Sequence, residues 1–220
     1  MYRILQILTD AEIAECRAIA ADAPFVDGKI SNPQSLAKKN EQLHEPAAYK
    51  KSSELLKQAL TRSPEFIEFA LPVAMAAPMM ARYGPGMEYG AHADSAFIPL
   101  PGATLRSDIS CTVFISDPAD YDGGELRVRA GDADLTFKLK AGEAILYPSD
   151  ALHQVLPVTR GERLVAITFI QSRVRDPFQR KVLLELTQVG AAEGSKMKPE
   201  NHARLQLIQQ NLLRYWGEQP

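Results

Sequence analysis

The stretch "ERLVAITFIQS", residues 162 to 172, decides the fold. Between Leu164 and Ile170 all side chains but one are apolar, so neither face of this segment suits water. A β-strand points alternate side chains to opposite faces, and a strand that is apolar on both faces needs protein packed on each side. We therefore expect this segment to lie inside a sandwich or barrel.

Other short segments of similar character surround it. From about residue 69 to 172 the chain alternates between apolar runs and breaks made of Gly, Pro and Asp, a pattern typical of an antiparallel double sheet. In one run, Leu135, Phe137 and Leu139 alternate with polar residues, as in a strand with one wet face. The runs are "ISCTVFIS" (109 to 116), "GGELRVRA" (123 to 130) and "LTFKLKAGEAILYPS" (135 to 149).

The predicted fold class is therefore mainly β with flanking helices (α+β). Its core is a jelly roll, that is, a double-stranded β-helix, over residues 74–174. An N-terminal helical segment with a polar loop occupies residues 1–73, and C-terminal helices occupy residues 175–220.

Capping residues predict the N-terminal helices. Thr9 and Glu12 have the spacing of a capping box, which predicts a helix over "DAEIAECRAIAAD" (10 to 22). A second helix is expected over "SSELLKQALTR" (52 to 62), and Ser63 with Pro64 then caps a short helical turn.

Residues 27 to 52 between these helices are polar and show no sustained period, so we expect a long loop. Whether this loop is a lid over the substrate is left open. Lys38, Lys39 and Asn40 within it either meet substrate or form a solvated charged run.

The tail is predicted to be helical over "DPFQRKVLLELTQ" (176 to 188) and "HARLQLIQQNLLRYWGE" (202 to 218). In the last helix an apolar stripe faces either the barrel or a second subunit, which would make a homo-oligomer. The stripe consists of Leu205, Ile208, Leu212 and Trp216.

Composition excludes several classes of function. The 220 residues carry a net charge of −2 with no basic stripe, which argues against a nucleic-acid partner. The most apolar stretch, residues 66 to 83, is broken by Glu68 and prolines, so we expect no membrane helix. Cys16 and Cys111 have no zinc or disulfide spacing and suit a reducing cytosol. The predicted location is cytoplasmic.

One pair of polar residues stands out in "YGAHADSAF" (89 to 97). If this segment ends a strand, the period of two places His92 and Asp94 on the same face. Of the remaining histidines, His44 lies in the polar loop and His202 on the polar side of the last helix. His153 follows a predicted strand and lies at the rim of the same sheet system.

His92, Asp94 and His153 are therefore the candidate metal ligands. Two imidazoles and one carboxylate on one face of an octahedron leave three positions open, as in non-heme Fe(II) oxygenases. A His-x-Asp pair also arises by chance in polar loops, so the pair alone is weak evidence.

Arg163 strengthens the metal hypothesis. Alternation places it on the same side of its strand as Val165 and Ile167, and a guanidinium in an apolar barrel needs an anion. The distal carboxylate of a dicarboxylic cosubstrate fits it through two parallel hydrogen bonds. The alternative is an arginine at a strand end whose head reaches solvent.

An ordered series of motifs over nearly the whole chain resembles the Fe(II)- and 2-oxoglutarate-dependent dioxygenases, in particular the PKHD-type hydroxylases related to prolyl 4-hydroxylases. The chain departs from relatives at Ser95, where they commonly have Asn, and near Phe169, where they commonly have Trp. The motifs are "GKISNPQSLAKKNEQL" (28 to 43), "ARYGPGMEYGAHADSA" (81 to 96), "RSDISCTVFISDPADYDGGELRV" (106 to 128), "AGEAILYPSDALHQVLPVTRGER" (141 to 163) and "IQSRVRD" (170 to 176).

The resemblance implies an oxidoreductase that hydroxylates a substrate C–H while 2-oxoglutarate and O2 become succinate and CO2. By it, His92, Asp94 and His153 bind iron, Arg163 binds 2-oxoglutarate, and ascorbate (vitamin C) rescues over-oxidised iron. Tyr83 matches a tyrosine that offers its hydroxyl to 2-oxoglutarate in prolyl hydroxylase relatives, although a core tyrosine bonded to backbone explains it as well.

Two rival functions stay open at this point. One is a cupin-like metal enzyme that does not use 2-oxoglutarate, since barrels of this shape host many chemistries. The other is a non-catalytic ligand-binding jelly roll. The sequence does not distinguish a small-molecule substrate from a peptidyl one, and it leaves the oligomeric state open.

Overall fold

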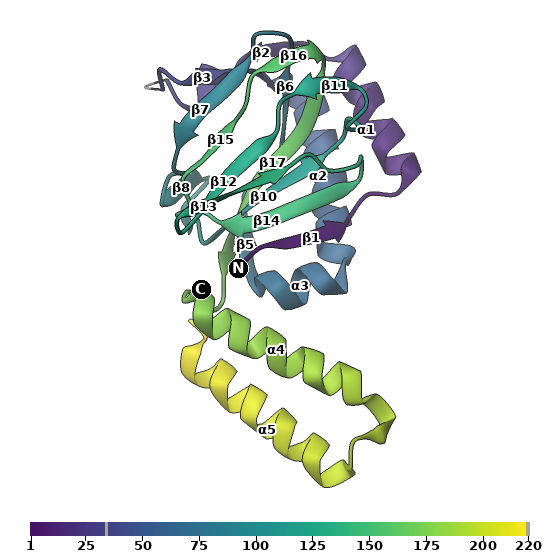
Figure 1. Cartoon of the computed structure of the whole chain (residues 1–220), viewed down its shortest axis with the longest axis vertical. Helices are drawn as coiled ribbons and strands as arrows, with labels where there is room; N and C mark the ends of the chain where they lie inside the picture. The colour runs from purple at the N-terminus through teal and green to yellow at the C-terminus, as the bar shows by residue number, and fades with distance from the viewer. Residues whose placement is uncertain (34, 219–220) are drawn as a thin grey trace.

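A computed structural model describes residues 1–33 and 35–218, and two antiparallel sheets form its body (Figure 1). The larger sheet has the order β1-β14-β10-β17-β6-β4-β2, with β5 also paired to β17. Its strands are β1 (Arg3–Gln6), β2 (Phe25–Asp27), β4 (Glu41–Leu43), β5 (Pro72–Met75), β6 (Met79–Tyr83), β10 (Ile109–Phe114), β14 (Glu143–Pro148) and β17 (Arg163–Ser172).

The smaller sheet has five strands in the order β13-β12-β15-β7-β3. Two further pairs, β8 with β9 and β11 with β16, complete the body, so the predicted jelly-roll fold with flanking helices is confirmed. The strands are β3 (Lys38–Lys39), β7 (Glu88–His92), β12 (Leu126–Ala130), β13 (Ala133–Phe137), β15 (His153–Val155), β8 (Phe97–Leu100), β9 (Ala103–Arg106), β11 (Tyr121–Gly123) and β16 (Val158–Gly161).

Strand β17 lies inside the larger sheet, between β10 and β6, as its two apolar faces predict. Val165 packs into the cluster that fills the space between the two sheets, with Leu126 and Val128 of β12. Leu164 and Ala166 point the other way, into the cluster beneath the N-terminal helices. The strand therefore joins the two cores, and burial of both faces holds the larger sheet between them.

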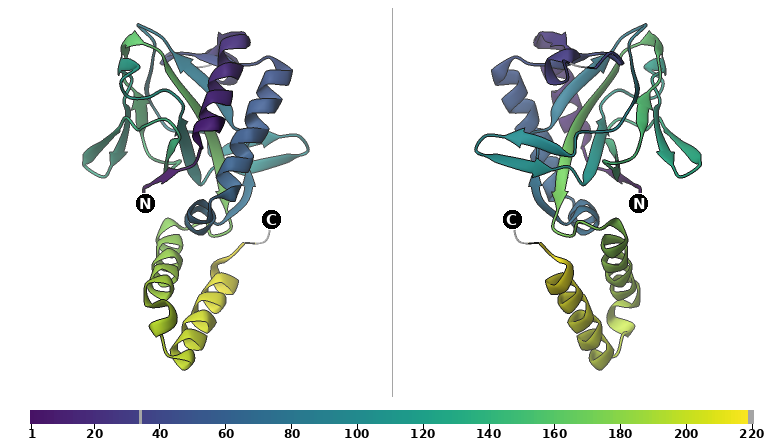
Figure 2. Two further views of the ribbon diagram at one scale, coloured as in Figure 1. Left: turned by 90° about the vertical axis from the view of Figure 1, so that its right-hand side faces the viewer. Right: turned by 90° about the vertical axis from the view of Figure 1, so that its left-hand side faces the viewer.

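Helices α1 (Asp10–Asp22), α2 (Pro46–Arg62) and α3 (Pro64–Ala70) cover the outer face of the larger sheet (Figure 2). The predicted capping box at α1 is confirmed, since the Glu12 amide donates to Thr9 Oγ1 and the Thr9 amide donates to Glu12 Oε2. Ser63 accepts from the Phe66 amide and caps α3, as predicted.

The prediction of an unstructured loop over residues 27 to 52 is wrong, apart from residue 34, which lies outside the described residues. This segment forms a 3-10 helix at Gly28–Ser31, strands β3 and β4, and the first turns of α2. Strands of two or three residues are too short to show a period, and β3 and β4 exist because distant strands pair with them. The α2 cap is Glu45, which is not among the usual capping residues.

The tail forms a hairpin of α4 (Pro177–Glu193) and α5 (Pro199–Trp216) that extends away from the sheets (Figures 1 and 2). Both predicted helices are present. Helix α5 contacts α4, where Leu205 lies at Gly190, and Ile208 of the predicted stripe is 49% exposed. The division of the chain at residues 73 and 174 stays a prediction.

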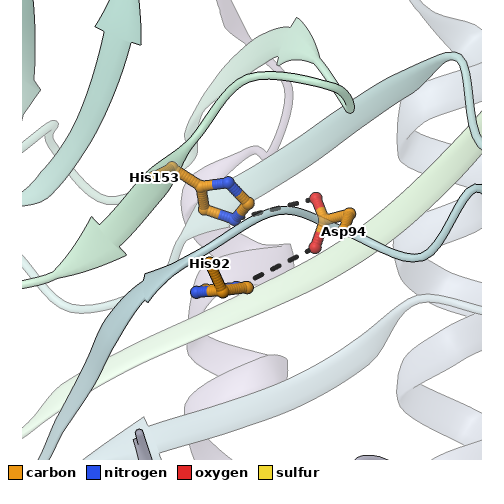
Figure 3. Close-up of side chains that lie close together, drawn as sticks. All are labelled: His92, Asp94 and His153. Atoms are coloured by element: carbon orange, nitrogen blue, oxygen red, sulfur yellow. Dashed lines mark ion pairs between the residues drawn. The ribbon is translucent and has the colours of Figure 1, made fainter.

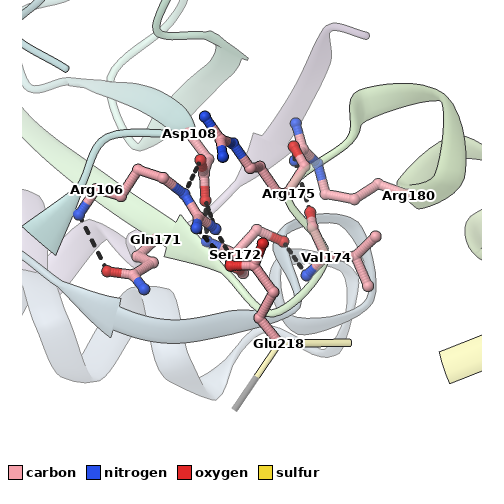
Figure 4. A network of polar contacts seen from close by, with 8 residues as sticks. All are labelled: Arg106, Asp108, Gln171, Ser172, Val174, Arg175, Arg180 and Glu218. Carbon is pink, nitrogen blue, oxygen red and sulfur yellow. Dashed lines mark hydrogen bonds and ion pairs between the residues drawn. The ribbon is translucent and has the colours of Figure 1, made fainter. Parts of the chain in front are cut away.

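A polar network ties the end of this hairpin back to the larger sheet (Figure 4). Arg106 donates through Nε and Nη2 to the Asp108 carboxylate and forms an ion pair with Glu218. The Asp108 carboxylate also accepts from the Ser172 amide at 2.8 Å, and the Glu218 amide donates to the Arg173 carbonyl. The chain after α5 is therefore held beside the edge of β9.

Among the helices of residues 1–33 and 35–218, none combines the length and apolarity that a bilayer crossing requires.

Candidate active site

The three predicted ligands meet at the rim of the smaller sheet (Figure 3). His92 ends β7, His153 begins β15, and the two are paired across these antiparallel strands. Asp94 follows β7 by two residues, and its carboxylate lies 4.0 Å from His92 Nε2 and 3.7 Å from His153 Nε2. One ligand atom from each residue lies within 4.8 Å of the others.

Backbone carbonyls orient both imidazoles. His92 Nδ1 lies 2.8 Å from the Gly90 carbonyl, and His153 Nδ1 lies 2.9 Å from the Ala151 carbonyl. Because a carbonyl only accepts, Nδ1 carries the proton in each ring. Each Nε2 therefore has a free lone pair directed at Asp94, which is the arrangement of metal-binding histidines.

Burial keeps His92 neutral. Desolvation, with the neighbouring charge of His153, lowers the pKa of His92 to about 4, so the ring is unprotonated near pH 7. Burial also raises the pKa of Asp94, against the opposing effects of His153 and the Ser110 hydroxyl. A buried carboxylate beside two neutral imidazoles lacks a counter-charge, and a divalent cation would supply it.

Two buried serines support Asp94 from the side of the larger sheet. The Ser110 hydroxyl donates to Asp94 Oδ2 at 2.6 Å, and it lies 2.8 Å from the Ser149 hydroxyl. Ser110 is on β10, while Ser149 directly follows β14. This support was not predicted, although a serine inside the apolar run "ISCTVFIS" was a usable indication.

We expect Ser110→Ala to weaken Fe(II) binding about 10- to 100-fold, because the Asp94 carboxylate loses the donor that orients it. Anaerobic Fe(II) titration measures this change. Ser52→Ala in α2, which also removes a buried serine hydroxyl, is the control and should leave the affinity unchanged. Equal affinities of the Ser110→Ala variant and the unmodified protein would show that Asp94 needs no such support.

Arg163 is fully inside the barrel, with 1% of its surface exposed. Its guanidinium carbon lies 5.0 Å from the Tyr83 ring centroid and 5.5 Å from that of Phe114. Its Nε and Nη1 are buried and have no hydrogen-bond partner among the described residues. The alternative of a strand-end arginine that reaches solvent is therefore wrong.

Arg163 and the three predicted ligands line one narrow cavity of about 50 Å³. Its wall combines apolar side chains from both sheets with a few polar groups, which is the usual character of a small-ligand site. The other lining residues are Tyr83, Tyr89, Ser110, Cys111, Thr112, Leu126, Tyr147, Val155, Ile167, Thr168 and Phe169.

These residues fit a divalent metal with a dicarboxylic cosubstrate. Two nitrogen donors and one oxygen donor converge at one end of the cavity, leaving the opposite side free for further ligands. Arg163 provides a buried cation with unused donors in the same cavity. An anion that is chelated at the metal and carries a second carboxylate would satisfy both groups.

Several other candidates have a structural place. Tyr83 pairs with Arg163 across β6 and β17 and lines the cavity. Gly123 and Gly124 have φ values of +72° and +67°, which supports their predicted turn role. Lys39 is exposed and pairs with Glu88 on the surface.

Not every polar residue near the motifs joins the site. His44 and His202 are exposed and lie outside the metal-binding group that the described residues form. Arg82 forms a 2.6 Å ion pair with Glu41 on the outer face of the larger sheet. Tyr89 was not predicted, yet its ring stacks on His92 with 3.6 Å between centroids.

Lys38 and Asn40 lie on the inner face of their strands, with 4% and 5% of their surfaces exposed. The Lys38 ammonium donates to the Ser31 hydroxyl at 2.7 Å and lies 5.3 Å from the Tyr89 ring centroid. The prediction of a solvated charged run is therefore wrong for these two residues. The pairing of β3 with β7 turns them inward, and short strands hide this from the sequence.

Burial lowers the pKa of Lys38 to about 8, from an ordinary value of 10.5. The unfolded chain then binds more protons between these two values, so the Lys38 term makes stability rise with pH across that window. We expect the advantage of Lys38→Met over the unmodified protein in free energy of unfolding to shrink between pH 8 and 10.5, by up to about 3 kcal/mol. Urea unfolding of both proteins at each pH measures it.

Lys39→Met is the control for this experiment, because Lys39 is the exposed neighbour of Lys38. Its difference from the unmodified protein should not vary with pH in that window. If the two Met variants give parallel curves, the Lys38 ammonium is not destabilised by its surroundings.

Comparison with known proteins identifies the family. Residues 78–171 match the model of the 2OG-Fe(II) oxygenase superfamily. A PKHD-type hydroxylase of Sphingopyxis alaskensis is 55% identical over 216 residues, which cover 98% of this chain and 99% of that protein. The chain belongs to the PKHD-type hydroxylases.

Solved structures agree at the level of the fold. A Pseudomonas putida prolyl-4-hydroxylase matches with a TM-score of 0.55 at 20% identity, over 78% of this chain and 92% of that one. HygX of Streptomyces hygroscopicus, solved with nickel, 2-oxoglutarate and hygromycin B bound, matches with a TM-score of 0.53 at 13% identity, over 77% and 82% of the two chains.

As a PKHD-type hydroxylase, the chain is an Fe(II)- and 2-oxoglutarate-dependent dioxygenase that hydroxylates its substrate. The predicted enzyme class is confirmed, and the two rival functions, a cupin-like enzyme without 2-oxoglutarate and a non-catalytic jelly roll, are not supported.

Proposed function

We propose that His92, Asp94 and His153 are the iron ligands of this hydroxylase, and that Arg163 and Tyr83 hold 2-oxoglutarate. The observation that carries the proposal is the meeting of three ligand atoms within 4.8 Å in the cavity that also contains the unpartnered Arg163 guanidinium. The ordered tautomers of both histidines support it, since each presents Nε2 to the same point.

Bound Fe(II) and 2-oxoglutarate supply the oxidising power, by which O2 and 2-oxoglutarate become succinate and CO2 and a substrate C–H becomes C–OH. The protein contributes placement. Arg163 binds the far carboxylate and fixes the cosubstrate along the cavity, and the Tyr83 hydroxyl donates to it. The apolar walls from both sheets exclude water from the reacting groups.

The substrate is proposed to be a small molecule or a peptidyl group. The structural neighbours support both, since one is a prolyl-4-hydroxylase and another is bound to hygromycin B. The net charge of −2 argues against a nucleic-acid substrate. Buried Lys38 near the His92 side of the site supports a lid role for the segment that contains it.

Anaerobic titration with Fe(II) and 2-oxoglutarate, followed by exposure to O2 with a panel of candidate substrates, tests the proposal. We expect one equivalent of each to bind, and succinate release to rise with the true substrate. A chain that binds Fe(II) at a place unaffected by substitution of the three ligands would contradict the assignment.

Ascorbate is proposed as the reductant that restores the iron after uncoupled turnover, and its effect is read as a longer linear phase of succinate release. A cytoplasmic location is proposed because Cys16 and Cys111 are both free and buried, which suits a reducing compartment.

A homo-oligomer through the C-terminal hairpin is also proposed. Its surface carries large exposed apolar side chains, among them Phe178 of α4 at 71% and Leu207 of α5 at 59%. Light scattering should give a mass above that of one chain for the unmodified protein, and Leu207→Glu should reduce it. A monomer at all concentrations contradicts this proposal.

A further inference from the structure

Tyr121 is a buried tyrosine whose hydroxyl has no use in the folded chain. None of its surface is exposed, and its hydroxyl has no hydrogen-bond partner in residues 1–33 and 35–218. Buried tyrosine hydroxyls normally have a partner, because an unpaired polar group in an apolar interior is destabilising. An unpaired hydroxyl at this place therefore needs an explanation.

Its surroundings hold the ring of Tyr121 firmly. The residue is on β11 and pairs with Gly161 of β16, and the Lys138 ammonium donates to the Tyr121 carbonyl and lies 4.3 Å from the ring centroid. The ring therefore has a fixed position before any ligand arrives. A fixed donor adds affinity without the entropic cost of ordering a side chain.

The hydroxyl belongs to the same polar cluster as Arg163. A Cβ at Gly124 would lie 3.0 Å from Arg163 Cδ and 3.1 Å from Tyr121 Cε2, so both side chains pass this glycine side by side. Burial raises the pKa of Tyr121, and the nearby positive charge of Arg163 acts in the opposite direction. Tyr121 Oη and two guanidinium nitrogens of Arg163 are thus three adjacent buried polar atoms without partners.

A carboxylate satisfies all of them. Its two oxygens offer about four acceptor positions, of which a guanidinium takes two and leaves room for a hydroxyl donor. Tyr83 is the less exclusive candidate for this donor, because its hydroxyl also has the Asn40 side chain beside it.

We propose that the Tyr121 hydroxyl donates a hydrogen bond to the far carboxylate of 2-oxoglutarate, beside Arg163. This inference rests on the proposed role of Arg163. Tyr121 then closes the end of the cosubstrate site and helps to select 2-oxo acids that carry a second carboxylate. An acid without that carboxylate gains nothing from either residue.

The test compares Tyr121→Phe with the unmodified holoenzyme in anaerobic titrations, read by the absorbance of the Fe(II) chelate. The probes are 2-oxoglutarate and 2-oxobutyrate, which is a 2-oxo acid without a second carboxylate. We expect Tyr121→Phe to bind 2-oxoglutarate about 10- to 100-fold more weakly and 2-oxobutyrate equally well. Tyr49→Phe, at a half-buried tyrosine of α2, is the control and should change neither affinity.

A second readout is the thermal unfolding midpoint of the protein without metal or cosubstrate. Loss of an unpartnered hydroxyl should leave the midpoint unchanged or raise it, whereas loss of a structural hydrogen bond would lower it. Unchanged affinity for 2-oxoglutarate, or an equal loss for both acids, would overturn the inference alone. Failure of the unmodified protein to bind 2-oxoglutarate would overturn the proposed role of Arg163 and this inference together.

Discussion

Fe(II) binding and succinate formation should both be lost when His153 is replaced by alanine. His153 provides one of the three ligand atoms and comes from a different strand than the other two. Loss of an outer-shell partner already weakens metal affinity 10- to 100-fold, so loss of a ligand should weaken it by more than about 100-fold. Anaerobic Fe(II) titration measures the affinity, and oxygen-dependent succinate release measures the activity.

His202→Ala is the matched control, because His202 is exposed on α5 and outside the cavity of the three ligands. It should bind Fe(II) and turn over as the unmodified protein does. A cooperative unfolding transition for His153→Ala must accompany the loss, so that misfolding is excluded. A folded His153→Ala variant with full Fe(II) affinity would remove this residue from the metal site.

The pairing of His92 with His153 shows what the sequence could predict about the site and what it could not. Period-two alternation puts His92 and Asp94 on one face, and a strand end before His153 puts it at a rim. Both inferences need only local patterns. That β7 and β15 are neighbours with these two histidines opposite each other is a matter of register between strands about 60 residues apart, which no local pattern encodes.

The same limit explains the residues that were missed. Ser110 supports Asp94 from β10, and Tyr121 approaches Arg163 from β11, so both act across strands that are distant in the sequence. Lys38 and Asn40 were misjudged because β3 has two residues and its inner face is defined only by its partner β7. Strand β17, by contrast, was predicted well because its ten residues carry their own evidence of burial on both faces.

Replacing Arg163 with methionine should have opposite effects on stability and on cosubstrate binding. In the protein without cosubstrate, the guanidinium is buried with two nitrogens unpartnered, so an apolar side chain of similar length should raise the free energy of unfolding by about 1–3 kcal/mol. With 2-oxoglutarate, removal of one partner of a buried charge pair should weaken binding by at least about 30-fold. Urea unfolding and anaerobic titration measure the two effects.

Arg129→Met is the matched control, since Arg129 on β12 is an exposed arginine with a 2.6 Å ion pair to Asp134. Surface pairs of this kind contribute little, so neither stability nor affinity should move much. The opposite signs for Arg163→Met distinguish a residue retained for function from one retained for packing. A structural arginine would lose stability on substitution, and a lower free energy of unfolding with unchanged 2-oxoglutarate affinity would contradict the assigned role. A gain in stability joined to a loss of binding has one economical explanation, namely that the ligand supplies the missing partner.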